Sequence, residues 1–88
     1  MTTYRLVTTP TVRRQLGETL PESVAFAAYE FINGPLLESP WRVGKRLHGP
    51  LHGRLAARLG TYRVIYRVDD DEHTVTVLHV AHRGDAYR

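Results

Sequence analysis

The chain has 88 residues, a formal net charge of +3, 42% hydrophobic residues and no cysteine. This length predicts a single domain over residues 1–88, and the hydrophobic content excludes a globally disordered chain. The missing cysteine excludes disulfides, and no apolar run is long enough to cross a bilayer, so we expect a cytoplasmic protein without a membrane partner.

The first residues predict a strand followed by a short helix. Residues 4–8 alternate polar and apolar side chains, which is the pattern of a half-buried strand. Thr9 and Pro10 are typical of a helix N-cap and first helical position, because the threonine hydroxyl can accept a backbone N–H and proline needs no donor there. We expect this helix to extend to about Leu16 and to end at Gly17.

A longer helix is predicted from Pro21 to the sequence Asn33-Gly34-Pro35, which would end it. Residues 35–53, with three prolines and three glycines, predict a loop with at most one helical turn. Trp41 is expected to anchor this loop to the core. Apolar residues recur at helical spacing along the long helix and are interpreted as its core-facing stripe. The stripe consists of Val24, Ala27, Ala28, Phe31 and Ile32.

Three strands should follow, at about residues 53–59, 61–68 and 74–81. Gly60 predicts a tight first turn, and the acidic run 69–72 predicts a solvated second turn. Adjacent antiparallel pairing then gives an α+β fold. It is a small antiparallel sheet with two N-terminal helices packed on one face, in the order β-α-α-β-β-β.

Strand alternation assigns the side chains of this sheet to two faces. The face toward the helices should carry Leu55, Ala57, Leu59, Tyr62, Val64, Tyr66, Val68, Thr76, Leu78 and Val80. The opposite face should carry Arg54, Ala56, Arg58, Arg63, Ile65, Arg67, Val75, Val77, His79 and Arg83. Three large β-branched residues would then be exposed on the second face, so we expect a protein partner to cover part of it.

Positive charge is concentrated on that second face. Nine of the twelve lysines and arginines lie in residues 42–88, and four of the five acidic residues there form the run 69–72. Arginine binds phosphate through a planar fork and remains charged at physiological pH. Arginines at alternate strand positions therefore favour a surface that binds a polyanion such as nucleic acid.

Other chemistry-bearing patterns are weak. His79 and His82 lie three residues apart on a strand and point to opposite faces, so they cannot share a metal ion. No nucleotide-binding glycine motif, catalytic triad or pair of carboxylates is visible, and we expect neither a metal nor another cofactor. The imidazole of His82 suits proton transfer, but its parity places it on the helix side unless the strand ends before it.

Two motifs resemble the RelE toxins of the RelE/ParE superfamily: the sequence YRVIY at Tyr62–Tyr66 and the ending HR-x-x-x-Y at His82–Tyr87. The opening YRLVTTPTVRRQLGETLPESV is similar to their first strand and helices, so the likeness covers essentially the whole chain. The resemblance implies a ribosome-dependent endoribonuclease that cuts the mRNA codon in the ribosomal A site and is silenced by a cognate antitoxin. It also implies cleavage by attack of the ribose 2′-hydroxyl on the neighbouring phosphate, without a metal.

Position by position, the resemblance assigns roles to residues of the last third. Arg63 would clamp the scissile phosphate, Arg83 would assist the leaving group, and Tyr87 would stack on or orient the nucleotide. Ala56 stands where the best-known members carry a lysine proposed as general base, so His82 or Tyr87 is a candidate to replace it. The candidate catalytic residues are Arg54, Arg63, His82, Arg83 and Tyr87, and the candidate RNA-binding residues are Lys45, Arg46, Arg58 and Arg67.

Two alternatives differ in class from the nuclease. A ParE-like member of the same superfamily would inhibit DNA gyrase without catalysis, and a passive RNA-binding adaptor would use the same basic face. The arginine–tyrosine ending favours the nuclease. Its implied partners are a cognate antitoxin and the ribosome with mRNA in the A site. An acidic or amphipathic antitoxin segment would cover the arginines.

Overall fold

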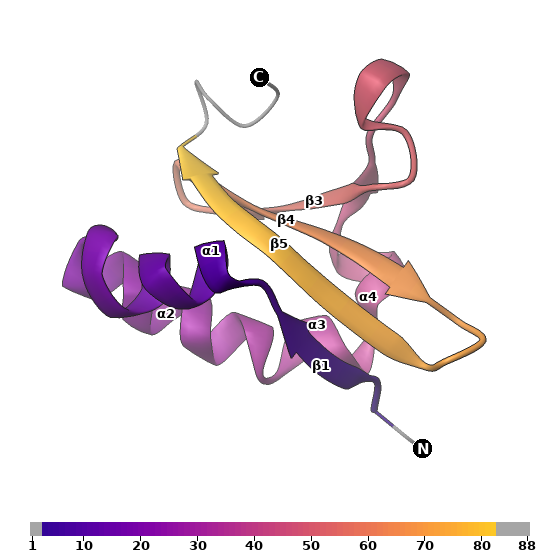
Figure 1. Ribbon diagram of the computed structural model, residues 1–88, viewed down its shortest axis with the longest axis horizontal. Helices are drawn as coiled ribbons and strands as arrows, with labels where there is room; N and C mark the ends of the chain where they lie inside the picture. Colours follow the sequence, from indigo (N-terminus) through magenta and orange to yellow (C-terminus); the bar gives the residue numbers. More distant parts are fainter. Residues whose placement is uncertain (1–2, 83–88) are drawn as a thin grey trace.

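The computed structural model describes residues 3–82, in which helices cover one face of a five-stranded sheet (Figure 1). The strand order is β1-β5-β4-β3-β2. In this part of the chain, no helix combines the length and apolar character that crossing a membrane requires. The elements are β1 (Arg5–Thr8), α1 (Pro10–Arg14), a π-helical turn η1 (Gln15–Thr19), α2 (Glu22–Ile32), α3 (Pro35–Glu38), α4 (Pro40–Val43), β2 (Lys45–Arg46), a 3₁₀ turn η2 (Gly49–Leu51), β3 (Leu55–Leu59), β4 (Tyr62–Asp69) and β5 (Thr74–His82).

The predicted α+β class is confirmed, but the sheet is not wholly antiparallel. Strands β3, β4 and β5 pair antiparallel in chain order, as predicted, and the short strand β2, which was not predicted, pairs antiparallel with β3. β1 instead pairs parallel with β5, from Arg5 opposite Thr74 to Thr8 opposite Val77. The long connection through the helices makes this possible, because parallel neighbours need a crossover and cannot be joined by a tight turn.

The first helix begins as predicted but ends later. The Thr9 hydroxyl accepts a hydrogen bond from the backbone N–H of Val12 at 3.2 Å, and Pro10 is the first helical residue. Gly17 does not end the helix, which continues through η1 until Leu20 becomes extended. Because proline disfavours the helical conformation in the residue before it, Pro21 sets this end.

The region between α2 and β3 is more helical than predicted. Residues 35–53 contain the two short helices α3 and α4, each with a proline among its first residues. The first N–H groups of a helix have no partner within the helix, so proline, which has no N–H, is well tolerated there. Pro35 and Pro40 therefore start helices here. Leu36 and Pro40 are both buried. In α2, Ala28 and Ile32 of the predicted stripe are buried, whereas Ala27 is exposed.

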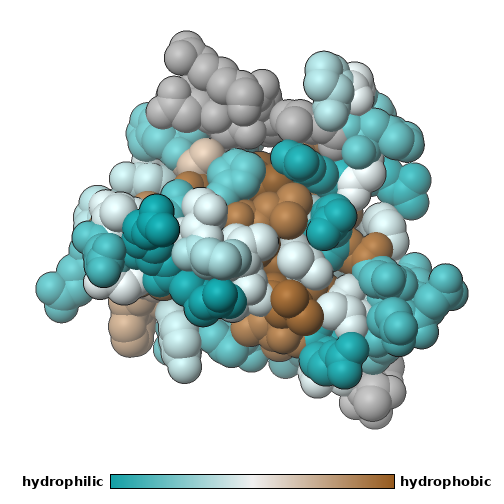
Figure 2. Space-filling view, viewed as in Figure 1, coloured by the Kyte–Doolittle hydropathy of each residue, from teal (hydrophilic) through white to brown (hydrophobic). Residues whose placement is uncertain are grey.

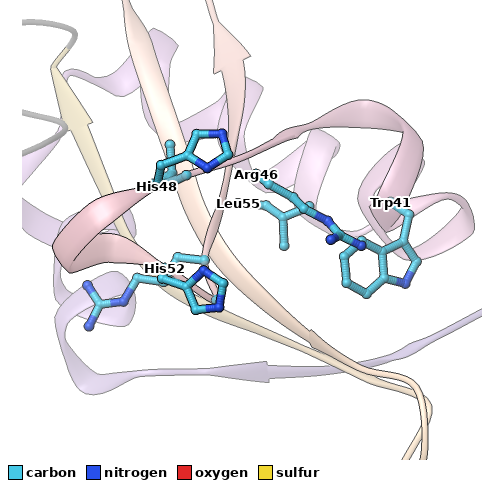
Figure 3. Close-up of a pocket in the computed structure, with 8 residues that line it drawn as sticks. Trp41, Arg46, His48, His52 and Leu55 are labelled. Atoms are coloured by element: carbon cyan, nitrogen blue, oxygen red, sulfur yellow. The ribbon is translucent and has the colours of Figure 1, made fainter.

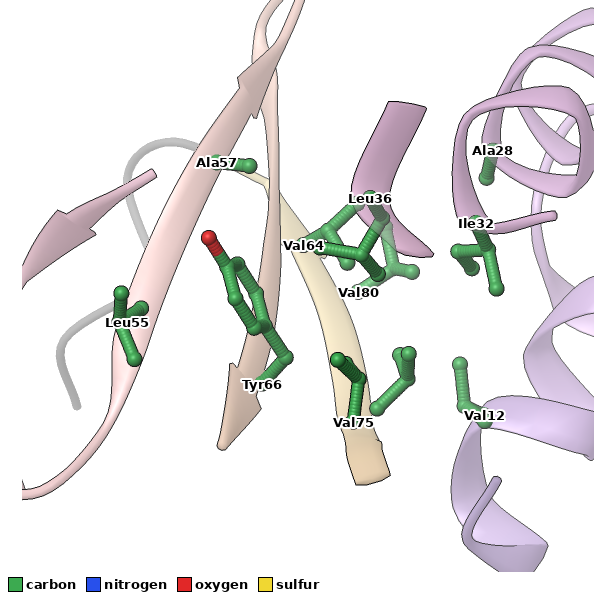
Figure 4. Packing of buried hydrophobic residues seen from close by; sticks show 11 residues of the cluster. Val12, Ala28, Ile32, Leu36, Leu55, Ala57, Val64, Tyr66, Val75 and Val80 are labelled. Atoms are coloured by element: carbon green, nitrogen blue, oxygen red, sulfur yellow. The ribbon is translucent and has the colours of Figure 1, made fainter. Parts of the chain in front are cut away.

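The hydrophobic core lies between the sheet and the helices (Figure 4). The predicted inward faces of β3 and β4 are confirmed, because Leu55, Ala57, Val64 and Tyr66 belong to this core. Burying such side chains is the main favourable term in folding. The cluster consists of Val12, Ala28, Ile32, Leu36, Leu55, Ala57, Val64, Tyr66, Val75, Val77 and Val80.

The face assignment of β5 was partly wrong. Val75 and Val77, predicted to point away from the helices, are fully buried in the core. Val77 pairs with Tyr66 and His79 pairs with Ile65, so the intervening Leu78 has no partner in β4. This β-bulge reverses the alternation, which brings Val75 and Val77 on one side of it and Val80 on the other side to the same core.

Helix α1 and the turn after it hold the bulge. Thr9 donates its backbone N–H to the Val77 carbonyl at 3.2 Å and its hydroxyl to the Leu78 carbonyl at 2.6 Å. The Gln15 amide donates to the Val80 carbonyl at 2.5 Å and accepts from the Val80 N–H at 2.7 Å. β1 has ended at this point, so these two side chains supply the partners that the edge of β5 would otherwise lack.

The bulge also removes the expected apolar patch from the second face. Ile65 is only 1% exposed. Among the exposed large hydrophobic residues of the described chain, Val7 lies on this face at the edge strand β1, whereas Phe26, Tyr29 and Trp41 lie on helices. In the view of Figure 2, hydrophobic side chains gather over β5 and β1 among hydrophilic ones. An apolar contribution of Val75 and Val77 to partner binding is therefore excluded.

The anchoring of the bulge by Thr9 leads to a stability prediction. Thr9→Ala removes both the helix cap and the hydrogen bond to Leu78, and should lower the free energy of unfolding by about 1–3 kcal/mol. Urea denaturation followed by circular dichroism measures this. Thr11→Ala, at an exposed position of the same helix, should leave stability nearly unchanged. Equal effects of the two changes would contradict the anchoring role.

Candidate nucleic-acid interface

The sheet face opposite the helices carries Arg54, Arg58, Arg63, Arg67 and His79, and is called the arginine face. The arginines were predicted there, and the alternation of β3 and β4 with their buried neighbours confirms it. His79 also reaches this face, since Val80 beside it points into the core. The reason differs from the prediction, because the bulge at Leu78, and not simple alternation along β5, turns His79 to this face.

A groove of about 500 Å³ lies along this face at β2, β3 and the end of α4. Its lining in the described chain includes four cationic side chains and no carboxylate. Such a surface favours binding of a polyanion, because bound phosphate neutralises charges that otherwise repel one another. The lining residues of this basic groove are Arg42, Val43, Gly44, Lys45, Leu47, Ala56, Arg58 and Arg63.

The strand register fixes the spacing of the charges in the basic groove. Arg58 and Arg63 lie directly opposite each other on β3 and β4, and Lys45 lies opposite Ala56. Like charges in directly opposite positions destabilise a sheet. The small side chain of Ala56 leaves open the space between these cations. The pairing is therefore unfavourable for folding and suited to holding an anion.

A close contact between Gly44 and Tyr66 holds α4 beside the groove. The Tyr66 hydroxyl is buried and donates to the Pro40 carbonyl at 2.6 Å, and burial raises the pKa of Tyr66 to about 12. A Cβ atom at Gly44 would lie 2.1 Å from this hydroxyl oxygen. Arg42 reaches the groove through this arrangement. Arg42 was not predicted as a site residue, because it lies in a segment without strand alternation.

Two of the predicted RNA-binding residues lie outside the basic groove. Arg46 pairs with the core residue Leu55, and its guanidinium lies over the Trp41 ring, 5.0 Å from the centroid. Arg67 lines a separate hollow together with the acidic residues 69–71. Neighbouring carboxylates weaken its attraction for phosphate, so Arg67 is a poorer anion site than Arg58 or Arg63.

Arg54 and Arg46 line a second cavity of about 260 Å³ beside the β2–β3 connection. Figure 3 shows His48 and His52 at this cavity, with Arg46 beside Trp41. Arg54 is also close enough to His79 to contribute to its electrostatics. Arg54 thus belongs to the arginine face but not to the lining of the basic groove.

The prediction that Trp41 anchors its segment to the core is wrong. Trp41 is 41% exposed, and its Nε1 donates to the two carboxylate oxygens of Asp70 at 3.0 and 3.2 Å. The Tyr4 hydroxyl donates to the same carboxylate at 2.6 Å. The hydrogen bonds from Tyr4 and Trp41 both lower the pKa of Asp70, and the one from Tyr4 has the larger effect. Trp41 therefore ties α4 to the turn between β4 and β5.

The predicted histidine is not brought to the groove. His82 is the last residue of β5, and its ring packs edge-on against Tyr62 at 5.3 Å. Ala81, not His82, lies opposite Arg63, so His82 points to the other side of the sheet from the arginine. Arg83 and Tyr87 lie outside the described residues.

His79 is the imidazole that the structure places on the arginine face. His79 is partly buried. This burial lowers the pKa of His79 from the ordinary value of 6.5, and the positive charge of Arg54 lowers it further. A histidine with a lowered pKa is neutral at pH 7 and can accept a proton. Sequence alternation had assigned His79 to this face without giving it a role.

The sequence and fold identify the family. A model described as "ParE toxin of type II toxin-antitoxin system, parDE" matches residues 8–87, and the chain belongs to this family of toxins. Toxin RelE of Mycobacterium tuberculosis is 46% identical over 85 residues, which are 97% of this chain and 87% of that protein. Toxin RelG of the same organism is 47% identical over 85 residues, covering 97% of each. The predicted membership of the RelE/ParE superfamily is thereby confirmed.

Solved structures agree with this assignment. The RelBE2 toxin–antitoxin complex from Mycobacterium tuberculosis contains a chain with a TM-score of 0.85 and 46% identity, each chain being covered to 97%. The Escherichia coli RelBE complex contains a chain with a TM-score of 0.74 and 23% identity, covering 90% of this chain and 95% of that one. The second likeness shows the shared fold alone.

Gly44 offers a test of how the groove is built. Gly44→Ala should lower the free energy of unfolding by about 1–3 kcal/mol, because the added methyl overlaps the buried Tyr66 hydroxyl. Gly17→Ala is the matched control, since its Cβ would meet nothing within 4 Å. Alanine is the better helix former, so the control should raise stability by about 0.5–1 kcal/mol. Thermal melting of the two variants measures both, and a stable Gly44→Ala would contradict the close contact.

Proposed function

We propose that this toxin is a ribosome-dependent mRNA endonuclease that cuts codons in the ribosomal A site and so inhibits translation. The observation that carries the proposal is the basic groove, in which Arg58 and Arg63 lie directly opposite each other without a carboxylate among the described lining residues. Two curated relatives at 46 and 47% identity, named Toxin RelE and Toxin RelG, support it.

The proposed reaction is attack of a ribose 2′-hydroxyl on the adjacent phosphate. The 2′ oxygen forms a bond to phosphorus while the bond from phosphorus to the 5′ oxygen breaks. Negative charge builds on the phosphate oxygens in this transition state, and fixed guanidinium groups stabilise it more strongly than they stabilise the bound substrate. Arg63 and Arg58 would hold the scissile phosphate, with Arg42 and Lys45 along the approaching strand. No metal takes part in this mechanism.

Arg83 and Tyr87 keep the roles that the family resemblance implies. Arg83 would assist the leaving 5′ oxygen, and Tyr87 would orient the nucleotide. Arg54 would add positive charge beside the groove, whereas Arg46 and Arg67 would contribute less because each has another close neighbour. The cleavage assay below extends directly to Arg83→Ala and Tyr87→Phe.

Gyrase inhibition is the second candidate, and the ParE description of the matching family model favours it. Induced expression separates the two functions. The nuclease predicts translation arrest with mRNA cut within codons, whereas the inhibitor predicts gyrase-trapped DNA breaks. Intact mRNA on ribosomes exposed to the purified toxin, together with trapped breaks, would replace the first proposal by the second.

The groove arginines provide the mutational test of the nuclease. Arg63→Ala and Arg58→Ala should each reduce cleavage of mRNA on ribosomes with a vacant A site by about 10²–10³-fold, the usual cost of removing one transition-state charge partner. Primer extension locates and quantifies the cuts. Arg14→Ala, an exposed change on α1, should retain the wild-type rate. Wild-type cleavage by both groove variants would end the assignment.

A cognate antitoxin is proposed as the protein partner, with an acidic segment over the basic groove. The RelBE2 complex and the archaeal RelE–RelB complex contain chains that are 46 and 28% identical to this chain, and they support such a partner. Electrostatic complementarity acts mainly on the rate of association.

The doubly substituted Arg58→Ala/Arg63→Ala toxin should therefore associate with its antitoxin about tenfold more slowly at low salt and show a weaker salt dependence. Surface plasmon resonance at several salt concentrations measures the rates, with Arg14→Ala as the control. Association that is insensitive to the double change would show that the antitoxin does not cover the groove.

A further inference from the structure

The bulge at Leu78 determines which side chains of β5 reach the arginine face. Val75 and Val77 point into the core, so unbroken alternation would place His79 in the core as well. The unpaired Leu78 shifts the phase by one residue and turns His79 to the opposite face. Bulges are common beside active sites because they re-aim a side chain in this way.

His79 is a diagonal cross-strand neighbour of Arg63, one of the two proposed phosphate-binding arginines, and lies outside the lining of the basic groove. It pairs with Ile65 on β4, and Arg63 is two residues from Ile65 on the same face. Ala56 lies on the other side of Ile65, so a row of small and aliphatic side chains separates His79 from Lys45. Both Ile65 and Ala56 are buried, and they form an apolar floor beside the imidazole.

The charged groups that face His79 are nearly all cationic. Asp69 is the acidic residue of β4 on this face and lies two positions beyond Arg67, at the far end of the strand. Positive neighbours and partial burial both disfavour a protonated imidazole. The charged residues that the other strands place on this face are Arg5 of β1, Lys45 of β2, Arg54 beside β3, Arg58 of β3, and Arg63, Arg67 and Asp69 of β4.

The proposed reaction needs a group that accepts the 2′-hydroxyl proton. Guanidinium and ammonium groups have no acceptor, so none of the cations that line the basic groove can do this while charged. A neutral imidazole can. His82 is excluded by its position, because it packs against Tyr62 on the other side of the sheet.

We propose that His79 is the catalytic proton acceptor of the cleavage reaction, a role that rests on the nuclease function proposed above. A ring nitrogen of His79 takes the 2′-hydroxyl proton as the 2′ oxygen bonds to phosphorus. The bond to the 5′ oxygen breaks, and that oxygen takes a proton from solvent. The products are a 2′,3′-cyclic phosphate and a 5′-hydroxyl, and the imidazolium returns its proton to water.

The test compares two histidine variants on the same strand. His79→Gln should reduce single-turnover cleavage of A-site mRNA by about 10²–10⁴-fold, the usual contribution of a general base. His82→Gln is the matched control and should cleave within about threefold of wild type. Circular dichroism melting shows whether each variant is folded. A His79→Gln rate equal to that of His82→Gln would overturn the proposal.

The pH dependence separates a proton acceptor from a merely structural residue. The wild-type rate should fall as pH decreases through the pKa of His79, which lies below 6.5, because the protonated ring can no longer accept. This acidic limb should be absent in His79→Gln and present in His82→Gln. A wild-type rate that stays flat from about pH 8 to pH 5 would overturn the proposal whether or not the variants fold.

Rescue gives an independent readout. Added imidazole should restore part of the activity of His79→Ala, because it can occupy the vacated space and accept the proton. Added imidazole should not restore the activity of Arg63→Ala, because this variant lacks a positive charge and still has its proton acceptor. If wild-type toxin leaves mRNA intact on ribosomes, the nuclease proposal itself fails. If wild-type toxin cleaves mRNA and His79→Gln cleaves it at the same rate, the nuclease proposal stands and only the proposed role of His79 fails.

Discussion

At Leu78, strand β5 gains one residue relative to β4. The hydroxyl of Thr9 donates to the carbonyl of this extra residue, and the amide of Gln15 binds the backbone of Val80 beyond it. Without this shift, Val80 could not face the same helical layer as Val75 and Val77, because side chains alternate strictly along a regular strand. The same hydrogen bonds attach α1 to the sheet. Core packing, the docking of the first helix and the position of His79 therefore depend on one local irregularity.

The basic groove depends in a similar way on a contact in the core. The Tyr66 hydroxyl donates to the Pro40 carbonyl within the core, and Gly44 leaves room for this hydroxyl. This contact fixes the end of α4 against β3 and β4, so Arg42 joins cations that come from three different strands. Cations that are positioned before the substrate binds lose little free energy on reorganisation when they meet a charged transition state.

The distribution of charge on the arginine face is uneven. Arg58 and Arg63 lie opposite each other without a described carboxylate in their groove, whereas Arg67 shares its hollow with acidic residues. Unpaired like charges oppose folding, and a protein keeps such an arrangement where a ligand supplies the opposite charge. One end of the face is thus suited to phosphate, and the other end is already neutralised by the turn between β4 and β5.

The sequence by itself determined the fold class, the helix starts at Thr9 and Pro21, the hairpin at Gly60 and the arginine face of β3 and β4. These features follow from local rules, since capping, turn conformation and strand alternation involve residues close together in the chain. The YRVIY motif and the C-terminal ending were enough to indicate the superfamily. Alternation also placed His79 beside the arginines, although for the wrong reason.

Only the tertiary structure decided the pairing of β1 with β5, the bulge at Leu78 and the neighbours of Trp41. Each depends on contacts between segments more than 25 residues apart, such as Thr9 with Leu78 and Trp41 with Asp70. The sequence VTVLHV at residues 75–80 does not reveal the bulge, because the side chains on either side of Leu78 alternate as they would in a regular strand. The groove likewise required α4 to fold back on the sheet, and that position is set by the packing of Gly44 against Tyr66.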